Sequence, residues 1–463
     1  MLLIAVVVYL LITIGIGAFA SRYVKTADDF MLAGRQLPLY MATTTVFATW
    51  FGSETVLGAS SEFIEKGLIG VIEDPFGSSL CLILVGLFFA RAFYRMNLHT
   101  LADYFGRRFG KSSELAASIC LIFSYFGWTA AQLAALGIIF ETVTGGAVSL
   151  ETGIWIGAGI VLFYTYIGGM WAISITDFFQ TIVIVVGMSV MAFLLVQKAG
   201  GFQNILNATP EGFFRMYPKC DAHSIMEYIA AWLIMSLGSI PQQDVFQRVM
   251  SSKNEDVAVQ ASIIGGLMYL SVAFLPLLVA LCAKVLYPEL LTKGSSDFLP
   301  RVMLVASPIY LQIIFFGALL SAILSTASGA TLAPATIMAE NLIKPHVKPM
   351  SDKSMLLCAR LSVLLVVLIS TVFALQGQNI YELVSSSSQL SLVSLFAPLV
   401  AGMVWKRANS QGSIGSMAVG MTLWLLFEHY KWAEIPSILP GLAGSLLAVW
   451  IISLCTSPRT AAL

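Results

Sequence analysis

A carboxylate stands inside an apolar segment near the start of the chain, in the stretch FATWFGSE at residues 47–54. Glu54 follows Gly52 and Ser53, and a charged side chain at the centre of a membrane helix costs roughly 2.5–3.5 kcal/mol on insertion scales. Unpaired backbone at membrane depth is tolerated only where an ion, a substrate or cavity water satisfies it. The stretch therefore predicts a helix that unwinds at a binding site.

A second apolar segment is interrupted at residues 238–241, Gly-Ser-Ile-Pro, and Gln242 and Gln243 follow directly. Proline lacks a backbone donor and clashes with the preceding turn, so this helix is expected to break. Each break alone could be a packing kink. Two breaks at matching places in two halves of a chain are typical of a transporter binding site.

Hydroxyl side chains are concentrated in SAILSTASGATLAPA, residues 321–335. Ser325 and Thr326 are adjacent, and the carbonyl of Ala322 lies one turn earlier, so the three oxygens could meet one Na⁺. Close packing between helices also enriches Ser, Thr, Gly and Ala. These residues alone favour packing, with an ion site as the alternative.

Asp177, in AISITDFFQ, follows the Gly168-Gly169 pair. One interpretation is a carboxylate at the membrane interface, where the dipole of a helix N-terminus favours it. The other places Asp177 beside the hydroxyls of residues 321–335 as an ion ligand.

The composition predicts that these residues belong to an all-α polytopic membrane protein. Of the 463 residues, 58% are hydrophobic and 11% are charged, and the mean hydropathy is +0.86. Apolar runs of about 20 residues predict about thirteen spans. The spans are expected near residues 2–21, 38–61, 68–94, 114–143, 149–169, 174–198, 223–244, 256–286, 302–341, 352–375, 380–404, 410–429 and 435–456, with a loop helix inside the ninth.

The distribution of Lys and Arg gives the orientation. Most of the 25 basic residues fall in loops of one side if the N-terminus is outside and the C-terminus is cytoplasmic. The breaks lie five spans apart, so a five-helix repeat must be inverted in its second copy. We expect one transporter domain over residues 1–463, with a peripheral helix at 2–21, repeats at 38–198 and 223–404, and peripheral helices at 410–456.

Several segments together resemble the sodium:solute symporters, and the pattern is most similar to their choline-transporter-like branch. These segments are DDFMLAGRQLP, FATWFGSE, GLFFARAFYR, YIGGMWAISITDFFQ, SIPQQDVFQRVMSS, SAILSTASG and WKRANSQG. The resemblance implies a leucine-transporter-type fold of two inverted five-helix repeats. It also implies Na⁺-coupled uptake of a solute by alternating access.

The resemblance also implies ion ligands, and here it favours the ion site over packing. The main sodium site would use the backbone carbonyls of Ala48 and Phe51 together with Ala322, Ser325 and Thr326. A second site would use Asp177, Ser328 and a hydroxyl at the next position, which is Gly329 in this chain. The missing hydroxyl favours one Na⁺ per solute.

The solute site is inferred from the same branch, which is expected to cage a quaternary ammonium with aromatic rings. Trp50 and Trp128 match two cage positions, whereas Gln242 and Ser78 replace two other aromatic positions. Acidic and amide groups near the expected cavity suit an amine that donates hydrogen bonds. The expected substrate-binding residues are Trp50, Glu54, Asp74, Ser78, Trp128, Gln242 and Gln243, with Glu73 either beside them or in an external loop.

The predicted activity is Na⁺-coupled import of a small amine or amino-acid-like solute. Uptake of a carboxylate, a sugar or choline, and an ion channel as a different class, are the alternatives. Neither HExxH nor GxSxG occurs in the sequence, and we expect no enzyme activity and no nucleic-acid partner. The expected partners are Na⁺, the solute and the lipid bilayer, and the sequence leaves open whether the chain works as a monomer.

Overall fold

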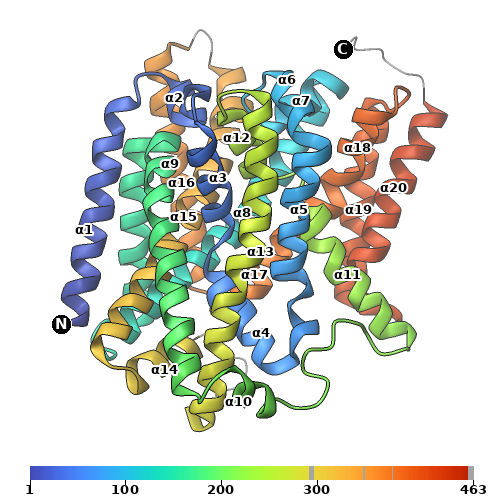
Figure 1. The fold of residues 1–463 in the computed structure, drawn as a ribbon. Coiled ribbons are helices and arrows are strands. Elements are labelled where there is room, and N and C mark those ends of the chain that lie inside the picture. Colours follow the sequence, from blue (N-terminus) through green and yellow to red (C-terminus); the bar gives the residue numbers. More distant parts are fainter. Residues whose placement is uncertain (291–296, 348–349, 378, 457–463) are drawn as a thin grey trace.

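The computed structural model describes residues 1–290, 297–347, 350–377 and 379–456, and its long helices run side by side along one axis (Figure 1). The elements are helical, as the composition predicts. The α-helices are α1 (Leu2–Ala20), α2 (Ala27–Leu32), α3 (Leu39–Trp50), α4 (Ala59–Lys66), α5 (Ser78–Leu84), α6 (Ala90–Met96), α7 (Leu101–Phe109), α8 (Lys111–Val143), α9 (Leu150–Lys198), α10 (Phe202–Asn207), α11 (Ala222–Gly238), α12 (Gln243–Ser251), α13 (Glu255–Leu286), α14 (Phe298–Ala306), α15 (Ile309–Ile337), α16 (Asp352–Ala374), α17 (Ile380–Ser391), α18 (Ala397–Val404), α19 (Ser410–Tyr430) and α20 (Ile438–Cys455).

Nine helical segments of the described ranges are long and apolar enough to cross a membrane, and the bent pair α11–α12 makes a tenth. The α3–α4 pair and α19 are not among them. Helix α9 counts once, although Gly169 (φ 48°, ψ −145°) interrupts its 49 residues. The figure of about thirteen spans therefore stays a prediction. The loop helix expected in the ninth span is α14, which precedes α15.

The first broken helix is α3, which ends at Trp50 because Phe51 leaves the helical region (φ −86°, ψ 76°). The Gly52 N–H donates to the Trp50 carbonyl at 3.1 Å. Helical geometry returns at Ser53, and a π-helical turn, Glu54–Gly58, leads into α4. The break thus lies at Phe51 and Gly52. The expectation that the break also includes Ser53 and Glu54 is wrong. Both residues already belong to the helical segment that leads into α4.

The second broken helix is the α11–α12 pair, which bends by 42° between Gly238 and Gln243, where the proline predicts a break. Gly238 allows close contact, since a Cβ there would stand 2.4 Å from the Ser388 carbonyl on α17. The two broken helices run in opposite directions: α3 leads downward to α4, whereas α11 leads upward to α12 (Figure 1).

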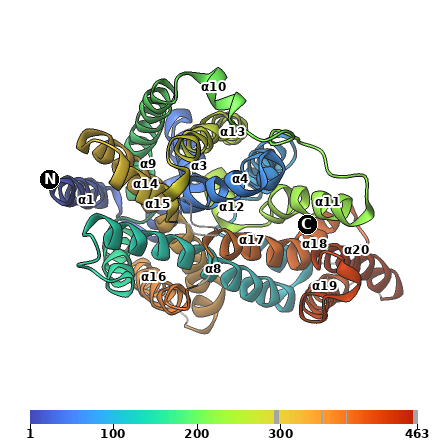
Figure 2. The ribbon, with the colours of Figure 1, turned by 90° about the horizontal axis from the view of Figure 1, so that it is seen from below.

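Helix α15 forms the centre of the bundle, packed against α3, α8, α9, α12 and α16. All its residues from Ala318 to Ile337 are buried, and their small side chains allow the neighbouring helices to approach closely. Seen from below, α3 and α12 lie near the middle, while α1 and α20 lie at opposite ends (Figure 2). Both broken helices therefore border the core helix.

Candidate functional site

The break in α3 faces the hydroxyls of α15. Because the Gly52 N–H bonds to Trp50, the Ala48 carbonyl loses the partner it would have in a continuous helix, and it accepts a hydrogen bond from Thr326 Oγ1 at 3.3 Å. Ala48 and Thr326 are fully buried. A backbone carbonyl and a hydroxyl from two helices thus converge, as the sequence interpretation of a cation site requires.

Asp177 joins this group from α9. Its Oδ1 accepts a hydrogen bond from Ser325 Oγ at 2.6 Å, while Oδ2 is buried with no partner among the described residues. Asp177 has no exposed surface and lies eight residues beyond the Gly169 break. Its alternative interpretation, as a carboxylate at the membrane interface, is therefore wrong.

The remaining expected ion ligands also lie in this region. Phe51 and Ala322 are fully buried, and Ala322 is one turn from Thr326 on α15, the helix that packs against α3. Ser328 Oγ donates to the Ser325 carbonyl at 2.8 Å, so it bonds within its own helix. The oxygens of Ala48, Ser325 and Thr326 are hard, uncharged donors, and Asp177 orients one of them, the Ser325 hydroxyl. This donor set fits a small hard cation such as Na⁺.

The Glu54 carboxylate is fixed from α8. Trp128 Nε1 donates to its Oε1 at 3.1 Å, and Gln132 Nε2 donates to its Oε2 at 2.7 Å. The Gln132 side-chain oxygen in turn accepts the Ser53 N–H at 3.0 Å, so it caps the helical half after the break. Glu54 and Trp128, both predicted substrate residues, are thus in direct contact.

Gly52 lies between the cation ligands and Glu54. A Cβ on this residue would stand 2.6 Å from Thr326 Oγ1 and 2.5 Å from Glu54 Oε2. Real Cβ atoms do not approach other atoms so closely. The glycine therefore allows the hydroxyl and the carboxylate to lie against the same stretch of backbone.

An aromatic cluster lies next to Glu54. The Trp50 and Trp128 rings meet edge to face with centroids 6.4 Å apart, and Tyr125 stacks on Trp128 at 5.9 Å. Trp50 Nε1 donates to Asp244 at 2.9 Å, and the Tyr125 hydroxyl donates to the other oxygen of Asp244. The two tryptophans expected in a cage are thus brought together, and Tyr125 provides a third ring.

Asp74 lies in the π-helical turn before α5, and Tyr269 links it to the segment that follows the break in α3. Its Oδ1 accepts the Tyr269 hydroxyl at 2.6 Å, and the same Tyr269 oxygen is 2.5 Å from Thr55 Oγ1 in the π-helical turn. Ser78, one turn after Asp74, is fully buried. Asp74 and Ser78 therefore lie inside the protein, as predicted for substrate residues.

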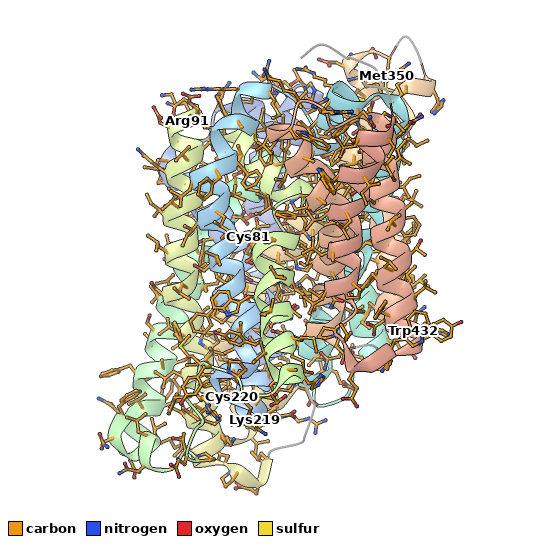
Figure 3. All side chains as sticks on the ribbon, turned by 90° about the vertical axis from the view of Figure 1, so that its right-hand side faces the viewer. Cys81, Arg91, Lys219, Cys220, Met350 and Trp432 are labelled. Atoms are coloured by element: carbon orange, nitrogen blue, oxygen red, sulfur yellow. The ribbon has the colours of Figure 1, made fainter. Side chains whose placement is uncertain are left out.

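Glu73, by contrast, lines a cavity of about 680 Å³ between α4, α11 and the end of α19. Its lining includes the acidic residues Glu62, Glu73, Glu227, Glu428 and Glu434, and the basic residues Lys66, Lys219 and Lys431. Lys219 lies at one end of the bundle with Cys220 and Trp432, opposite Arg91 and Met350 (Figure 3). Glu73 and Asp74 thus mark the boundary between this cavity and the interior.

The two expected glutamines diverge. Gln242 is buried, and its Nε2 has no partner among the described residues. Gln243 accepts the Leu101 N–H at 2.7 Å and donates to the His99 carbonyl at 3.4 Å, which fixes α12 to the start of α7. Both side chains are buried, but Gln242 ends the unwound segment and has an amide nitrogen with no partner among the described residues, whereas Gln243 begins α12 and is bonded to the segment before α7.

The segment held by Gln243 carries an ion pair between His99 Nε2 and Asp28 Oδ1 at 3.3 Å. The hydrogen bond to Asp28 raises the pKa of His99 above its usual 6.5. The same bond lowers the pKa of Asp28 below its usual 3.8. Both charged forms are favoured, so this pair ties α2 to the loop before α7 at the end of the bundle that carries Arg91.

Four polar residues of the site were not among the predicted ligands: Gln132, Tyr125, Asp244 and Tyr269. Two of them have a signal in the sequence. Asp244 follows the broken segment directly, and Gln132 lies one turn after Trp128 on α8. Tyr125 and Tyr269 could not be selected, because their roles depend on contacts with residues more than one hundred positions away.

Comparisons with known proteins agree with this arrangement. Residues 30–420 match the sodium:solute symporter family. The chain is 26% identical to the high-affinity choline transporter 1 of Caenorhabditis elegans, over 98% of this chain and 84% of the relative. It is 24% identical to the sodium/proline symporter of Escherichia coli, over 100% of this chain and 94% of the relative.

Among solved structures, a Na⁺-coupled sialic acid symporter in its substrate-bound outward-open state superimposes with a TM-score of 0.87. It is 19% identical, and the match covers 100% of this chain and 99% of that one. At this identity the likeness shows the fold, which is the leucine-transporter-type fold predicted from the sequence.

Proposed function

This chain belongs to the sodium:solute symporter family, and from this premise we propose that it imports a small protonated amine or amino-acid-like solute together with Na⁺. Membership makes it a multi-pass membrane protein that takes up a small organic solute with sodium as the coupling ion. The residues that bind each partner, and the class of the solute, are the parts we propose.

The sodium ion is assigned to Ala48, Phe51, Ala322, Ser325 and Thr326. The observation that carries this assignment is the 3.3 Å contact between the Ala48 carbonyl and the Thr326 hydroxyl across the break in α3. A carbonyl freed by unwinding and a hydroxyl on the facing core helix can both turn to an ion without leaving a charge unpaired in the membrane. Bound Na⁺ would hold α3 against α15.

The solute is assigned to the side chains of Glu54, Asp74, Trp50, Trp128, Gln242 and Ser78. Glu54 and Asp74 are almost fully buried, and no ion pair in the described part of the chain engages either one. Two carboxylates without a basic partner favour a cationic guest and disfavour a free carboxylate. The aromatic rings add cation–π attraction for an ammonium group.

The outer cavity supports the same charge preference. Five glutamates and three lysines line it, so acidic groups predominate on the route to Asp74. An excess of one sign of charge in the lining of a cleft raises the local concentration of the opposite ions. Both Na⁺ and a protonated amine would be concentrated there.

Choline is the second candidate, since a high-affinity choline transporter is among the relatives and the tryptophan pair is present. A quaternary ammonium has no N–H to donate to the Glu54 carboxylate, whereas a primary or secondary amine does. A primary amine therefore uses Glu54 more fully. An ion channel and an enzyme are the different classes that this proposal sets aside.

The transport cycle is assigned to the broken helices. We assign residues 38–198 and 223–404 to two inverted repeats, with the helices at 2–21 and 410–456 peripheral. The opposite directions of α3–α4 and α11–α12 support the inversion (Figure 1). The end with Lys219 would face outside and the end with Arg91 the cytoplasm, with the N-terminus outside. Residues 457–463, which include Arg459 of the predicted cytoplasmic C-terminus, lie outside the described residues.

A thermal-shift screen of the purified protein tests the proposal. Amines, amino acids, choline, carboxylates and sugars are added with Na⁺ or with K⁺, since a ligand stabilises the state that it binds. A primary or secondary amine should raise Tm, and more so in Na⁺. Stabilisation by a sugar or a dicarboxylate alone would contradict the solute assignment.

A further inference from the structure

Arg248 is a buried cation that lies against Thr49 on α3 and Gly329 on α15. It belongs to α12, and only 2% of its surface is exposed. Its Nε and Nη2 donate to Thr49 Oγ1 at 3.1 and 2.8 Å, while Nη1 has no hydrogen-bond partner among the described residues. A buried guanidinium held only by a hydroxyl needs a carboxylate nearby to offset its desolvation.

Two carboxylates provide that compensation. No ion pair within 4.0 Å engages Arg248 in the described part of the chain, and the carboxylates that act on its charge at longer range are Asp244 on its own helix and Asp177 on α9. Asp244 already accepts hydrogen bonds from Trp50 and Tyr125. Asp177 Oδ2, in contrast, is buried with no hydrogen-bond partner among the described residues, and the Thr45 hydroxyl is the other polar group that acts on this carboxylate. The Asp177 carboxylate therefore has a negative charge that a cation can still neutralise.

Gly329 leaves the space that the Arg248 guanidinium occupies. A Cβ on this residue would stand 2.6 Å from Arg248 Nη2 and 2.9 Å from Thr49 Cγ2. Gly329 follows Ser328 on α15, at the position where a second sodium site would need a hydroxyl. The same residue thus removes an ion ligand and makes room for a fixed positive charge.

We propose that the Arg248 guanidinium stands in for a second sodium ion beside Asp177, so that one Na⁺ accompanies each solute. The inference rests on the proposed function, because it takes Na⁺ as the coupled ion. Asp177 then acts as a positioning residue. It orients the Ser325 hydroxyl through the 2.6 Å hydrogen bond, while Arg248 neutralises its charge permanently.

The number of bound sodium ions tests the inference without any knowledge of the solute. Equilibrium binding of radioactive ²²Na⁺ to the purified full chain, with no solute present, gives the count per chain. The wild type should bind one ion without cooperativity. Arg248→Lys keeps the positive charge and should bind one. Arg248→Gln keeps most of the volume but removes the charge, and it should bind two.

Asp177→Asn provides a test that does not depend on changing Arg248. Its count should stay at one, because no ion is assigned to Asp177 itself. Size-exclusion profiles and Tm establish that each variant is folded. If Arg248→Gln does not fold, two ions bound by the wild type would still overturn the role of Arg248.

The outcomes distinguish a failure of the role proposed for Arg248 from a failure of the proposed sodium site. Two ions in the wild type, with a fall to one in Asp177→Asn, would overturn the role of Arg248 and leave sodium coupling intact. One ion in a folded Arg248→Gln would also overturn it. No bound sodium in the wild type would overturn the proposed sodium site, and the inference with it.

Discussion

Glu54 Oε2 and Thr326 Oγ1 lie against the same glycine, since a Cβ on Gly52 would stand 2.5 Å from the first and 2.6 Å from the second. The first atom belongs to the proposed solute site and the second to the proposed sodium site. A cation at one position must therefore influence the other through the shared backbone. Linkage makes such an influence reciprocal, so Na⁺ should raise solute affinity as much as solute raises Na⁺ affinity.

Gly52→Ala should weaken both sites at once. An inserted methyl group in a packed interior costs about 1–3 kcal/mol, and here it displaces a ligand of each site. We expect the Na⁺ concentration for half-maximal stabilisation to rise about tenfold or more, together with loss of the solute-induced Tm shift. Gly317→Ala is the matched control, because a Cβ there meets nothing within 4 Å. A Gly52→Ala protein with unchanged Na⁺ affinity would place the ion elsewhere.

Ser325→Ala and Thr326→Ala should each raise the Na⁺ requirement about 10- to 100-fold, since a bond to a charged group is worth about 1.5–3 kcal/mol. The Na⁺ dependence of Tm measures the change. Thr331→Ala is the control on the same buried helix, because its hydroxyl bonds only to the Ala327 carbonyl one turn back at 2.7 Å. Equal effects of all three substitutions would indicate a packing defect in α15.

Glu54→Gln should weaken binding of a protonated amine about 10- to 100-fold and leave Na⁺ binding nearly unchanged. The neutral amide keeps the shape of the side chain and removes the charge that the ammonium group meets. Glu62→Gln, at the rim of the outer cavity, is the comparison. An amine that binds Glu54→Gln with wild-type affinity would remove the carboxylate from the solute site.

These sites were only partly accessible from the sequence. Proline at 241 and glycine at 52 predicted both breaks, because backbone chemistry is local. The paired hydroxyls at 325 and 326 alone favoured packing, and only the family resemblance made them the proposed ion ligands; in the structure they contact Asp177 and the Ala48 carbonyl. The close approach of Arg248 to Gly329 could not be predicted. The two residues are far apart in sequence and meet only through the packing of α12 on α15.

Two further cases depended on contacts that the sequence does not show. Asp177 could be an interfacial residue or an ion ligand until its complete burial and its bond to Ser325 were known. Gln243 follows the broken segment as closely as Gln242 does, but the start of α12 turns its side chain to Leu101. Both glutamines are buried, and which of them is bonded to the segment before α7 depends on one helical step, which the sequence pattern does not contain.

The pair of His99 and Asp28 should make stability depend on pH. The pKa of His99 is raised above 6.5 and that of Asp28 is lowered below 3.8, so both are charged between these values and the pair contributes fully there. As the pH rises through the raised pKa of His99, its proton is lost and so is the contribution. As the pH falls through the lowered pKa of Asp28, the contribution is lost at the acidic end.

The measurement is the Tm difference between the wild type and His99→Gln, followed from about pH 6 to about pH 9. The difference should shrink as the pH rises. The charges of Glu340 and Asp103 also favour the protonated form of His99. Removing either charge should therefore also make the Tm difference between the wild type and His99→Gln smaller. His346→Gln is the control. A difference that stays constant over this range would contradict the assigned pair.

Uptake into proteoliposomes tests the central claim most directly. The labelled amine with the largest Na⁺-dependent Tm shift is added outside vesicles that contain the purified protein, with an inward Na⁺ gradient or with K⁺ replacing Na⁺. The account predicts accumulation above equilibrium only with the Na⁺ gradient, and its loss in Thr326→Ala at the same Na⁺ concentration. Uptake that proceeds unchanged when K⁺ replaces Na⁺ would contradict it.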